Sequence, residues 1–486
     1  MVFPIVGGDG KPTGYEIDNS IRLNDDDSHN ISNNPGGGSG SDGSRTQFSI
    51  SMWVKRSSLG LGDNSKQQFL TSAVATNNFY GTIKFGGNDA IAINLINSGS
   101  DQDEIHTDAV FRDVSAWYHL FFAFDKTQAS LADGVKLYVN GVLQTFGTTT
   151  YTQNQGYHFF RPGKSHYIGN YNGQEGYFDG YMAEVHFVDG QVKAHTDFGE
   201  TNDNGVWIPK DYTGSHGTYG FYLEFKQTGT SENSSGIGAD TSGNDEHFAV
   251  ANLAAIDVTT DTPTNNFCTL NSIAPDTTGS QNHNFFEGNT LVRSSSASWF
   301  NAFGTIGIPT SGKWYYEYKT TGSGSIDQNI GFVKGNFHRG SDGGIDQVDC
   351  YSLYAASNGN GYLYTDSASS VNKGSGYHWT HDDIMMVAID TSSRKIWYGK
   401  NGTFLGSGDP ASGSNEAQTV SAEDLAYGLL PAFSGYHTQS YHYVNFGNPS
   451  FSISSGNADA NGYGNFEYAP PSGYYSLCTK NLAEFG

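Results

Sequence analysis

The sequence predicts an all-β protein built from two antiparallel jelly-roll β-sandwiches in tandem, and three observations lead to this prediction. Only 15% of the 486 residues are charged, whereas 14% are aromatic and 63 are glycine. The polar residues are mainly Asn, Ser, Thr and Asp, which favour turns and exposed strand faces over helix surfaces. Short alternating runs recur along the chain, and only the segments near Ala254 and Ser421 favour a helical turn.

The first half contains the clearest alternation. Residues 48–54 place Phe, Ile, Met and Val at every second position, which predicts a half-buried strand. Residues 116–125 are apolar on both faces, as expected for a strand inside a sandwich. Residues 135–143 alternate and contain Asn140-Gly141, a pair that favours a two-residue hairpin turn. Residues 177–190 predict a further strand bounded by Asp-Gly pairs.

The second half echoes this pattern. A buried run ends at Asp390 and its successor turns at Asn401-Gly402, just as a run ends at Asp125 before the turn at Asn140-Gly141. Two related sandwiches are therefore expected. The strand-length runs of the second half are residues 312–320, 329–333, 351–355, 382–390, 395–402, 429–433 and 441–447.

These patterns predict four segments. The first sandwich is expected over residues 1–200 and the second over residues 285–455. Residues 201–284 contain one clear strand among polar, Gly-containing runs, and we expect them to form an extended connector that packs on both sandwiches. Residues 456–486 are expected to form a C-terminal tail.

Charge and cysteine content exclude two classes of function and favour one cellular compartment. A formal net charge of −24 repels phosphates and anionic lipids, so neither nucleic-acid binding nor membrane insertion is expected. Three cysteines do not make a disulfide framework in a chain of this length, which favours maturation in a reducing cytoplasm. The apolar run in residues 1–10 is too short for a signal peptide.

Two known folds and one class of protein resemble this sequence. SIRLNDDDSHNIS, FSISMWVKR and YFDGYMAEVHFVDG, within residues 21–199, resemble a laminin-G-like, concanavalin A-like domain. GKWYYEY, DDIMMVAID and YVNFGNPSF, within residues 285–451, resemble a SPRY domain. The order of GYEIDNSIRLNDDDS, GVWIPKDYTGSHGTYGFYLEF, DTPTNNFCTLN and PPSGYYSLCTKNLAE is similar to virion proteins of tailed bacteriophages, particularly marine and cyanobacterial ones. The resemblance implies a tail fibre, tail appendage or head-attached fibre.

Catalysis is not expected from the acidic residues. Glycoside hydrolysis requires two carboxylates about 5–10 Å apart across the scissile bond. The nearest candidates are spaced by five residues, at Asp179, Glu184 and Asp189. Successive members of this set therefore point to opposite faces of a strand. No zinc motif or nucleophile elbow occurs in the sequence, and the His378/His381 pair fits surface loops. The sequence therefore predicts a protein that is not an enzyme and has no certain cofactor.

Calcium is the one metal that the sequence leaves open. Asp25, Asp26 and Asp27 form the densest acidic group, and calcium prefers such oxygen ligands. Adjacent side chains of an extended segment diverge, however, so a solvated acidic turn fits these residues as well.

Aromatic residues in polar loops give the strongest indication of function. Sugar rings present apolar C–H faces to Tyr and Trp, while amides and carboxylates supply hydrogen bonds. The same residue types are also favoured where subunits pack, so each loop fits both interpretations. The candidate glycan-binding residues are Tyr167, Tyr171, Asn172, Tyr177, Tyr377, Trp379 and Tyr436.

Together these features predict a virion component that is assembled in the host cytoplasm and exposed on the outside of the particle. Its expected partners are other virion proteins, host-surface glycans and further copies of itself. Two alternatives remain: a structural decoration or adaptor subunit without glycan affinity, and a tailspike that depolymerises polysaccharide. Heptad repeats are absent, so any trimer must use sandwich surfaces.

Overall fold

The computed structural model describes residues 14–35, 44–59, 67–73, 79–97, 100–157, 159–160, 162–173, 175–274, 283–337, 344–345, 349–366 and 369–486. Strands account for 43% of the structure and helices for 7%, which confirms the all-β prediction. The chain divides into an N-terminal unit, Thr13–Thr264, and a C-terminal unit that contains Asn265–Gly486. Among the described residues no helix is both long enough and apolar enough to cross a membrane.

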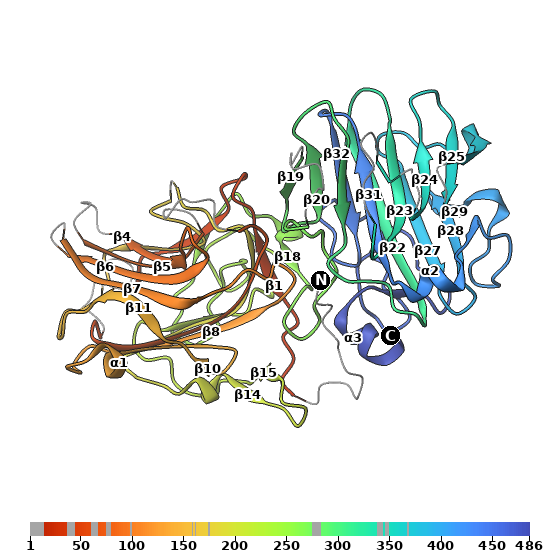
Figure 1. Cartoon of the computed structure of the whole chain (residues 1–486). Helices are drawn as coiled ribbons and strands as arrows, with labels where there is room; N and C mark the ends of the chain where they lie inside the picture. Colours follow the sequence, from red (N-terminus) through yellow and green to blue (C-terminus); the bar gives the residue numbers. More distant parts are fainter. Residues whose placement is uncertain are drawn as a thin grey trace. The chain divides into compact units, whose positions relative to one another are not determined.

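The N-terminal unit contains two eight-stranded sheets (Figure 1). Sheet A has the order β10 (Val142–Leu143), β9 (Val135–Val139), β8 (Tyr118–Asp125), β3 (Gln47–Arg56), β13 (Gly180–Asp189), β1 (Ser20–Leu23) and β18 (Val258–Thr259), and β16 (Phe221–Leu223) also pairs with β13. Sheet B has the order β11 (Phe146–Thr150), β7 (Ser100–Val110), β6 (Ala90–Asn97), β5 (Phe79–Phe85), β4 (Gln68–Ala73), β12 (Ser165–Ile168), β2 (Asn30–Asn33) and β17 (Ala249–Ala251). A hairpin of β14 (Gly199–Thr201) and β15 (Trp207–Pro209) and the short helix α1 (Leu131–Gly134) complete the unit.

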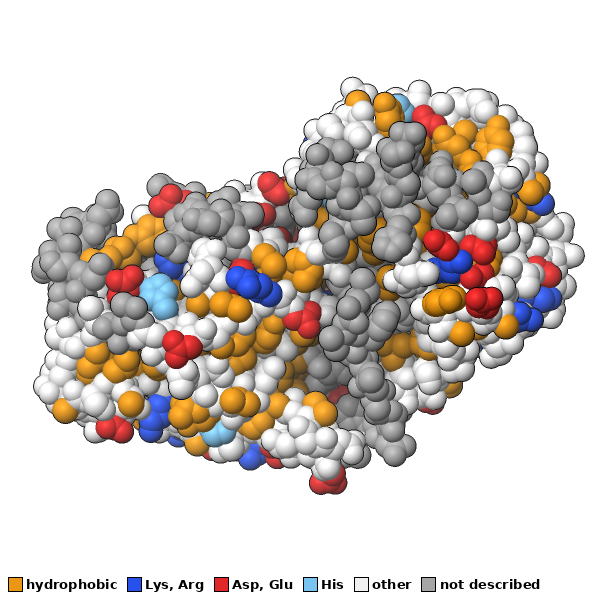
Figure 2. Space-filling view, in the orientation of Figure 1, with side chains coloured by type: hydrophobic (Ala, Val, Ile, Leu, Met, Phe, Trp, Pro, Cys, Tyr) orange, Lys and Arg blue, Asp and Glu red, His pale blue; other side chains and the backbone are white. Residues whose placement is uncertain are grey.

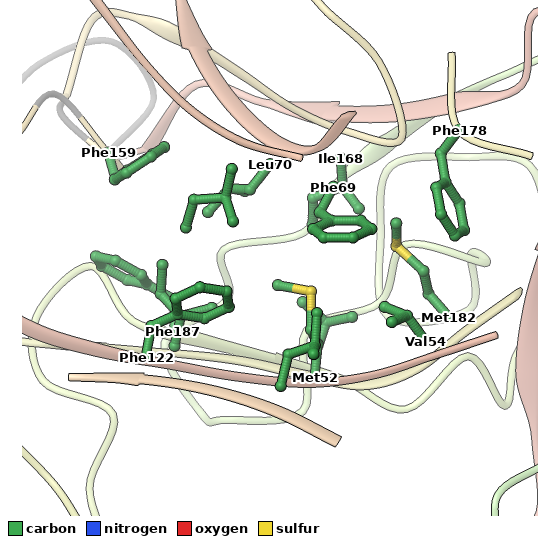
Figure 3. Close-up of a cluster of buried hydrophobic side chains, with 14 of the residues drawn as sticks. Met52, Val54, Phe69, Leu70, Phe122, Phe159, Ile168, Phe178, Met182 and Phe187 are labelled. Atoms are coloured by element: carbon green, nitrogen blue, oxygen red, sulfur yellow. The ribbon is translucent and has the colours of Figure 1, made fainter. Parts of the chain in front are cut away.

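The core of the N-terminal unit lies between these sheets. Met52 and Val54 from sheet A face Phe69 and Leu70 from sheet B, and all four are buried (Figure 3). The alternation of residues 48–54 therefore produces the expected strand, β3. The prediction that its second face is solvated was wrong, because Trp53 on that face is also buried.

Residues 201–264 extend both sheets of the first sandwich and cover part of the outer face of sheet A, which corrects the expected connector. Lys55 and Asp261 form a buried ion pair of 2.8 Å, and the Trp117 indole N–H donates to the same carboxylate at 3.1 Å. β16, β17 and β18 each extend a sheet of the first sandwich. These residues therefore belong to the N-terminal unit, and the structure divides the chain after Thr264.

The C-terminal unit is a second two-sheet sandwich. Sheet C has the order β19 (His283–Phe286), β20 (Leu291–Ser294), β32 (Ser440–Asn445), β22 (Lys313–Gly322), β27 (Ile384–Asp390), β28 (Lys395–Lys400) and β29 (Thr403–Phe404), with β30 (Gln418–Thr419) on β28 and β33 (Tyr475–Ser476) on β22. Sheet D has the order β21 (Phe300–Phe303), β31 (Leu429–Gly435), β23 (Gln328–Lys334), β24 (Cys350–Ala355), β25 (Gly361–Thr365) and β26 (Ser370–Gly374). The helices are α2 (Ala422–Ala426) and α3 (Thr479–Phe485).

The expected C-terminal tail is an integral part of this second sandwich. The buried Glu317 carboxylate on β22 accepts hydrogen bonds from the backbone N–H groups of Glu467 and Tyr468, at 3.0 and 2.7 Å. β33 then pairs in parallel with β22. Residues 456–486 are therefore held against sheet C by backbone pairing and by a buried acceptor.

Candidate functional site

The outer face of sheet B carries a hollow of about 390 Å³. Strands β4 to β7 form its floor and walls, and the loop after β12 forms part of its rim. Its lining residues are Gln68, Tyr80, Thr82, Lys84, Asn94, Ile96, Glu104, His106, Tyr171 and Glu175. The volume lies within the range of small-ligand sites, and the lining combines aromatic rings with several hydrogen-bonding side chains.

Strand alternation places these side chains. On β5, Ile83 and Phe85 point into the core, so Tyr80, Thr82 and Lys84 point outward into the hollow. Cross-strand register then aligns Thr82 with Asn94 on β6, and Asn94 with Glu104 on β7. The hollow is thus a property of neighbouring strand faces as well as of a loop.

Two tyrosines form the aromatic wall of the hollow. The rings of Tyr80 and Tyr171 are in edge-to-face contact, with centroids 5.5 Å apart. Burial, together with the neighbouring Tyr80 and Glu175, raises the pKa of Tyr171 to about 12. Both rings are half-buried, which leaves part of each accessible to a ligand.

Two threonines on the outer face of sheet B hold unused hydrogen-bonding capacity. Thr82 is 2% exposed and lines the hollow, and Thr71 is its register partner on β4. Neither hydroxyl has a hydrogen-bond partner among the described residues. Because buried polar groups are nearly always paired, the Thr82 hydroxyl, which lines the hollow, is an unpaired group that water or a polar ligand can satisfy.

The loop that carries Tyr171 contains two more of the predicted glycan-binding residues, Asn172 and Tyr177, and a third, Tyr167, lies on the strand before it. Tyr171 and Glu175 exchange backbone hydrogen bonds, and Asn172 between them has a positive φ of 55°. The Tyr177 hydroxyl donates to the Gly173 carbonyl at 3.2 Å. The ring of Tyr167, on β12, packs against Gly173, since a Cβ added to this glycine would lie 3.2 Å from the ring. Tyr167 and Tyr177 therefore support the loop, and Tyr171 is the candidate that lines the hollow.

The other three candidates lie in the C-terminal unit, and one of them was wrong. Trp379 is 1% exposed and belongs to the core, where its indole N–H donates to Gln328 at 3.2 Å, so a surface ligand does not reach it. Tyr377 is half-buried against the same core. Tyr436 is half-buried at the surface, with its ring 5.7 Å from that of Trp299.

The acidic turn at residues 25–27 has the geometry of a hydrogen-bonded turn. Asp27 accepts a hydrogen bond from the Asn24 amide at 2.8 Å, and the Ser28 backbone N–H donates to the Asp25 carbonyl at 3.1 Å. Asp26 and Asp27 are exposed. In the described part of the chain, no three His, Cys, Asp or Glu side chains converge to hold a metal ion. Calcium binding at Asp25, Asp26 or Asp27 stays a prediction.

Most residues of the hollow were not predicted from the sequence, because the ligand-binding candidates were expected in loops and these residues lie on strands. The signal was present in FYGTIKF and AIAINLIN, where apolar residues alternate with Tyr, Thr, Lys and Asn. Such alternation normally indicates an exposed strand face, and it does not reveal which neighbouring strands bring their polar faces together.

Comparisons with known proteins agree with the first sandwich. Residues 26–196 match the family model described as the concanavalin A-like lectin/glucanases superfamily, and this range contains every lining residue of the hollow. These residues form a concanavalin A-like domain, as the sequence resemblance implied. A search of curated proteins found no significant match.

Similar solved structures include members of two groups. The SPRY domain of human HERC1 is 17% identical, with a TM-score of 0.25, and covers 32% of this chain and 87% of its own. A human SPRY domain is 18% identical, with a TM-score of 0.24, and covers 32% and 90%. The heptameric SAP-like pentraxin of Limulus polyphemus is 13% identical, with a TM-score of 0.27, and covers 37% and 80%.

Proposed function

We propose that this chain is a non-enzymatic virion protein of a tailed bacteriophage and that the hollow on sheet B binds glycans of the host surface. The glycan part rests on one observation: Tyr80 and Tyr171 stand beside the unpartnered Thr82 hydroxyl in a hollow of about 390 Å³. Aromatic faces and buried hydroxyls are complementary to the C–H faces and hydroxyl groups of a sugar. The virion part rests on the sequence resemblance.

In this proposal the protein assembles in the host cytoplasm with other virion proteins and with copies of itself, and it acts on the outside of the particle. The match of residues 26–196 to the lectin/glucanase family supports carbohydrate recognition. Each unit has its own core. In this proposal the N-terminal unit binds the glycan and the C-terminal unit provides contacts within the virion.

A glycan array probed with the purified chain tests the proposal. Tyr80→Ala and Tyr171→Ala each remove one ring of the aromatic pair, and we expect each to weaken binding about tenfold, in line with the loss of a well-packed aromatic contact. Tyr427→Ala is the matched control, because Tyr427 is 54% exposed in the C-terminal unit and should leave binding unchanged.

Two results favour the alternatives. If the parent protein binds no host polysaccharide, the structural decoration or adaptor role replaces adhesion. The depolymerase alternative has one observation in its favour, since Glu104 and Glu175 both line the hollow and glycosidases use paired carboxylates. A loss of polysaccharide viscosity that Glu104→Gln abolishes would contradict a binding-only role.

A further inference from the structure

We propose that the hollow on sheet B selects uncharged sugars over acidic ones. This inference rests on the proposed glycan binding and adds the class of ligand. It follows from the balance of charges and uncharged donors around the hollow, both of which are fixed by the strands and the loop that line it.

Negative charge is in excess among the described lining residues. Glu104 extends from β7 and is 52% exposed, and Glu175 extends from the loop that carries Tyr171 and is also exposed. Lys84 on β5 is the one lysine or arginine among the lining residues that the structure describes. The described lining therefore holds two carboxylates, Glu104 and Glu175, against one lysine, in a chain whose formal net charge is −24.

His106 is directed toward one of these carboxylates. Its Nε2 atom lies 3.3 Å from Oε1 of Glu104, and its side chain is 28% exposed. Register places His106 opposite Ala92, with Lys84 on the other side of Ala92. The imidazole therefore interacts with Glu104, a carboxylate of the hollow itself.

Uncharged groups occupy the floor. The Thr82 hydroxyl has no partner in the described part of the chain, and it is able to donate and accept. The amides of Asn94 and Gln68 line the same hollow. Sugar hydroxyl and acetamido groups form hydrogen bonds with such side chains, and binding them does not require the desolvation of a charged group.

The expected discrimination is modest and depends on salt. One unit of like charge a few ångströms away, partly screened by water, corresponds to about tenfold weaker binding of a uronate than of its neutral counterpart, or about 1.4 kcal/mol. Because the Debye length falls from about 10 Å at 0.1 M to about 3 Å at 1 M ionic strength, the difference should shrink in high salt.

The test compares polymers of the same sugar configuration and linkage that differ only at C6: linear β-linked mannan with polymannuronate, and linear β-linked glucan with polyglucuronate. Affinities of the full chain are measured at low salt and at high salt. The double variant Glu104→Gln, Glu175→Gln should bring the acidic and neutral polymers to within about twofold of each other. Glu423→Gln is the matched control, since Glu423 is exposed on α2 in the C-terminal unit.

The outcomes separate the two proposals. Neutral polymers that bind about tenfold better than acidic ones, with discrimination lost in the double variant, support the inference. Equal or tighter binding of the acidic polymers overturns the inference and leaves glycan binding standing. If none of the polymers binds, while the parent and the double variant melt as folded proteins, both the proposed function and the inference are overturned.

Discussion

At the scale of single residues, His119 shows how burial fixes a protonation state. It is fully buried on the outer face of sheet A, where its Nδ1 accepts a hydrogen bond from the Trp207 indole N–H at 3.0 Å. Its Nε2 lies 2.8 Å from the Ser51 hydroxyl, so this nitrogen carries the proton. A second proton on Nδ1 would face the Trp207 N–H, and two donors repel each other.

This geometry predicts a loss of stability in acid. Burial, with smaller contributions from His186 and His195, lowers the pKa of His119 from 6.5 to about 3. Below pH 6.5 the His119 imidazole therefore binds a proton in the unfolded chain but not in the folded chain. The free energy of unfolding should fall by about 1.4 kcal/mol per pH unit from this residue as the pH drops from 6.5 toward 3.

Urea unfolding at pH 7 and pH 5 measures this effect in the parent and in His119→Gln. We expect the parent to lose about 2 kcal/mol more than the variant over this interval, because glutamine does not titrate. Parallel pH profiles of the two proteins would contradict the assignment of a neutral, buried imidazole.

At the scale of elements, the two predicted hairpins are confirmed. β9 and β10 meet at Asn140 and Gly141, whose φ values are 47° and 77°. β28 and β29 meet at Asn401 and Gly402, with φ of 48° and 83°. Positive φ at both central residues is what a type I′ turn requires, and Asn-Gly is the pair that adopts it most readily.

Replacing Gly141 with valine should destabilise the N-terminal unit by about 1 kcal/mol or more. A β-branched residue disfavours positive φ, and a Cβ at Gly141 would also lie 2.4 Å from the Trp207 ring. Gly205→Val is the matched control, because Gly205 has nearly the same φ of 78° but nothing within 4 Å of its Cβ. Chemical denaturation should therefore show a larger loss for Gly141→Val. Equal losses would mean that the contact with Trp207 does not matter.

The sequence predicts the long elements of this protein better than the short ones. Alternation and apolar runs identify β3, β8 and β27, because each spans seven or more residues and buries an extended surface. The run FYLEF is the one clear strand predicted within residues 201–284, and it contains β16. β17 and β18 have three and two residues, too few for any period to be visible. They form because strands within residues 20–33 pair with them, and no local pattern encodes this.

The candidate site shows the same limit. Tyr171 is identifiable from its polar aromatic loop, whereas Trp379 has the same kind of neighbours in sequence but lies in the core. The floor of the hollow depends on the register among four strands, and that register shifts between Gln68 and Leu70 and between Ala90 and Ala92. Such irregularities are set by tertiary packing, so the sequence identifies Tyr171 as a candidate but not the strands that surround it.

At the scale of the whole molecule, the chain consists of two units with separate cores, and charge is distributed over both. Figure 2 shows acidic and basic side chains scattered among uncharged ones on the face in view, with no continuous basic surface there. The boundary between the units falls between Thr264 and Asn265 because the preceding residues complete the first sandwich. Trp53, Trp117 and Tyr181 form a buried cluster on the outer face of sheet A, with Trp207 packed against it.

This boundary predicts which fragments fold. A fragment that ends at Thr264 retains β16, β17 and β18 and the ion pair between Lys55 and Asp261, so it should melt cooperatively. A fragment that ends at residue 200 loses these strands, leaves Lys55 buried without its carboxylate and exposes the aromatic cluster on sheet A, so it should aggregate or melt without cooperativity. Circular dichroism melts and size-exclusion chromatography of the two fragments distinguish these outcomes. A cooperative melt of the shorter fragment would show that residues 201–264 are, after all, a connector and not part of the first sandwich.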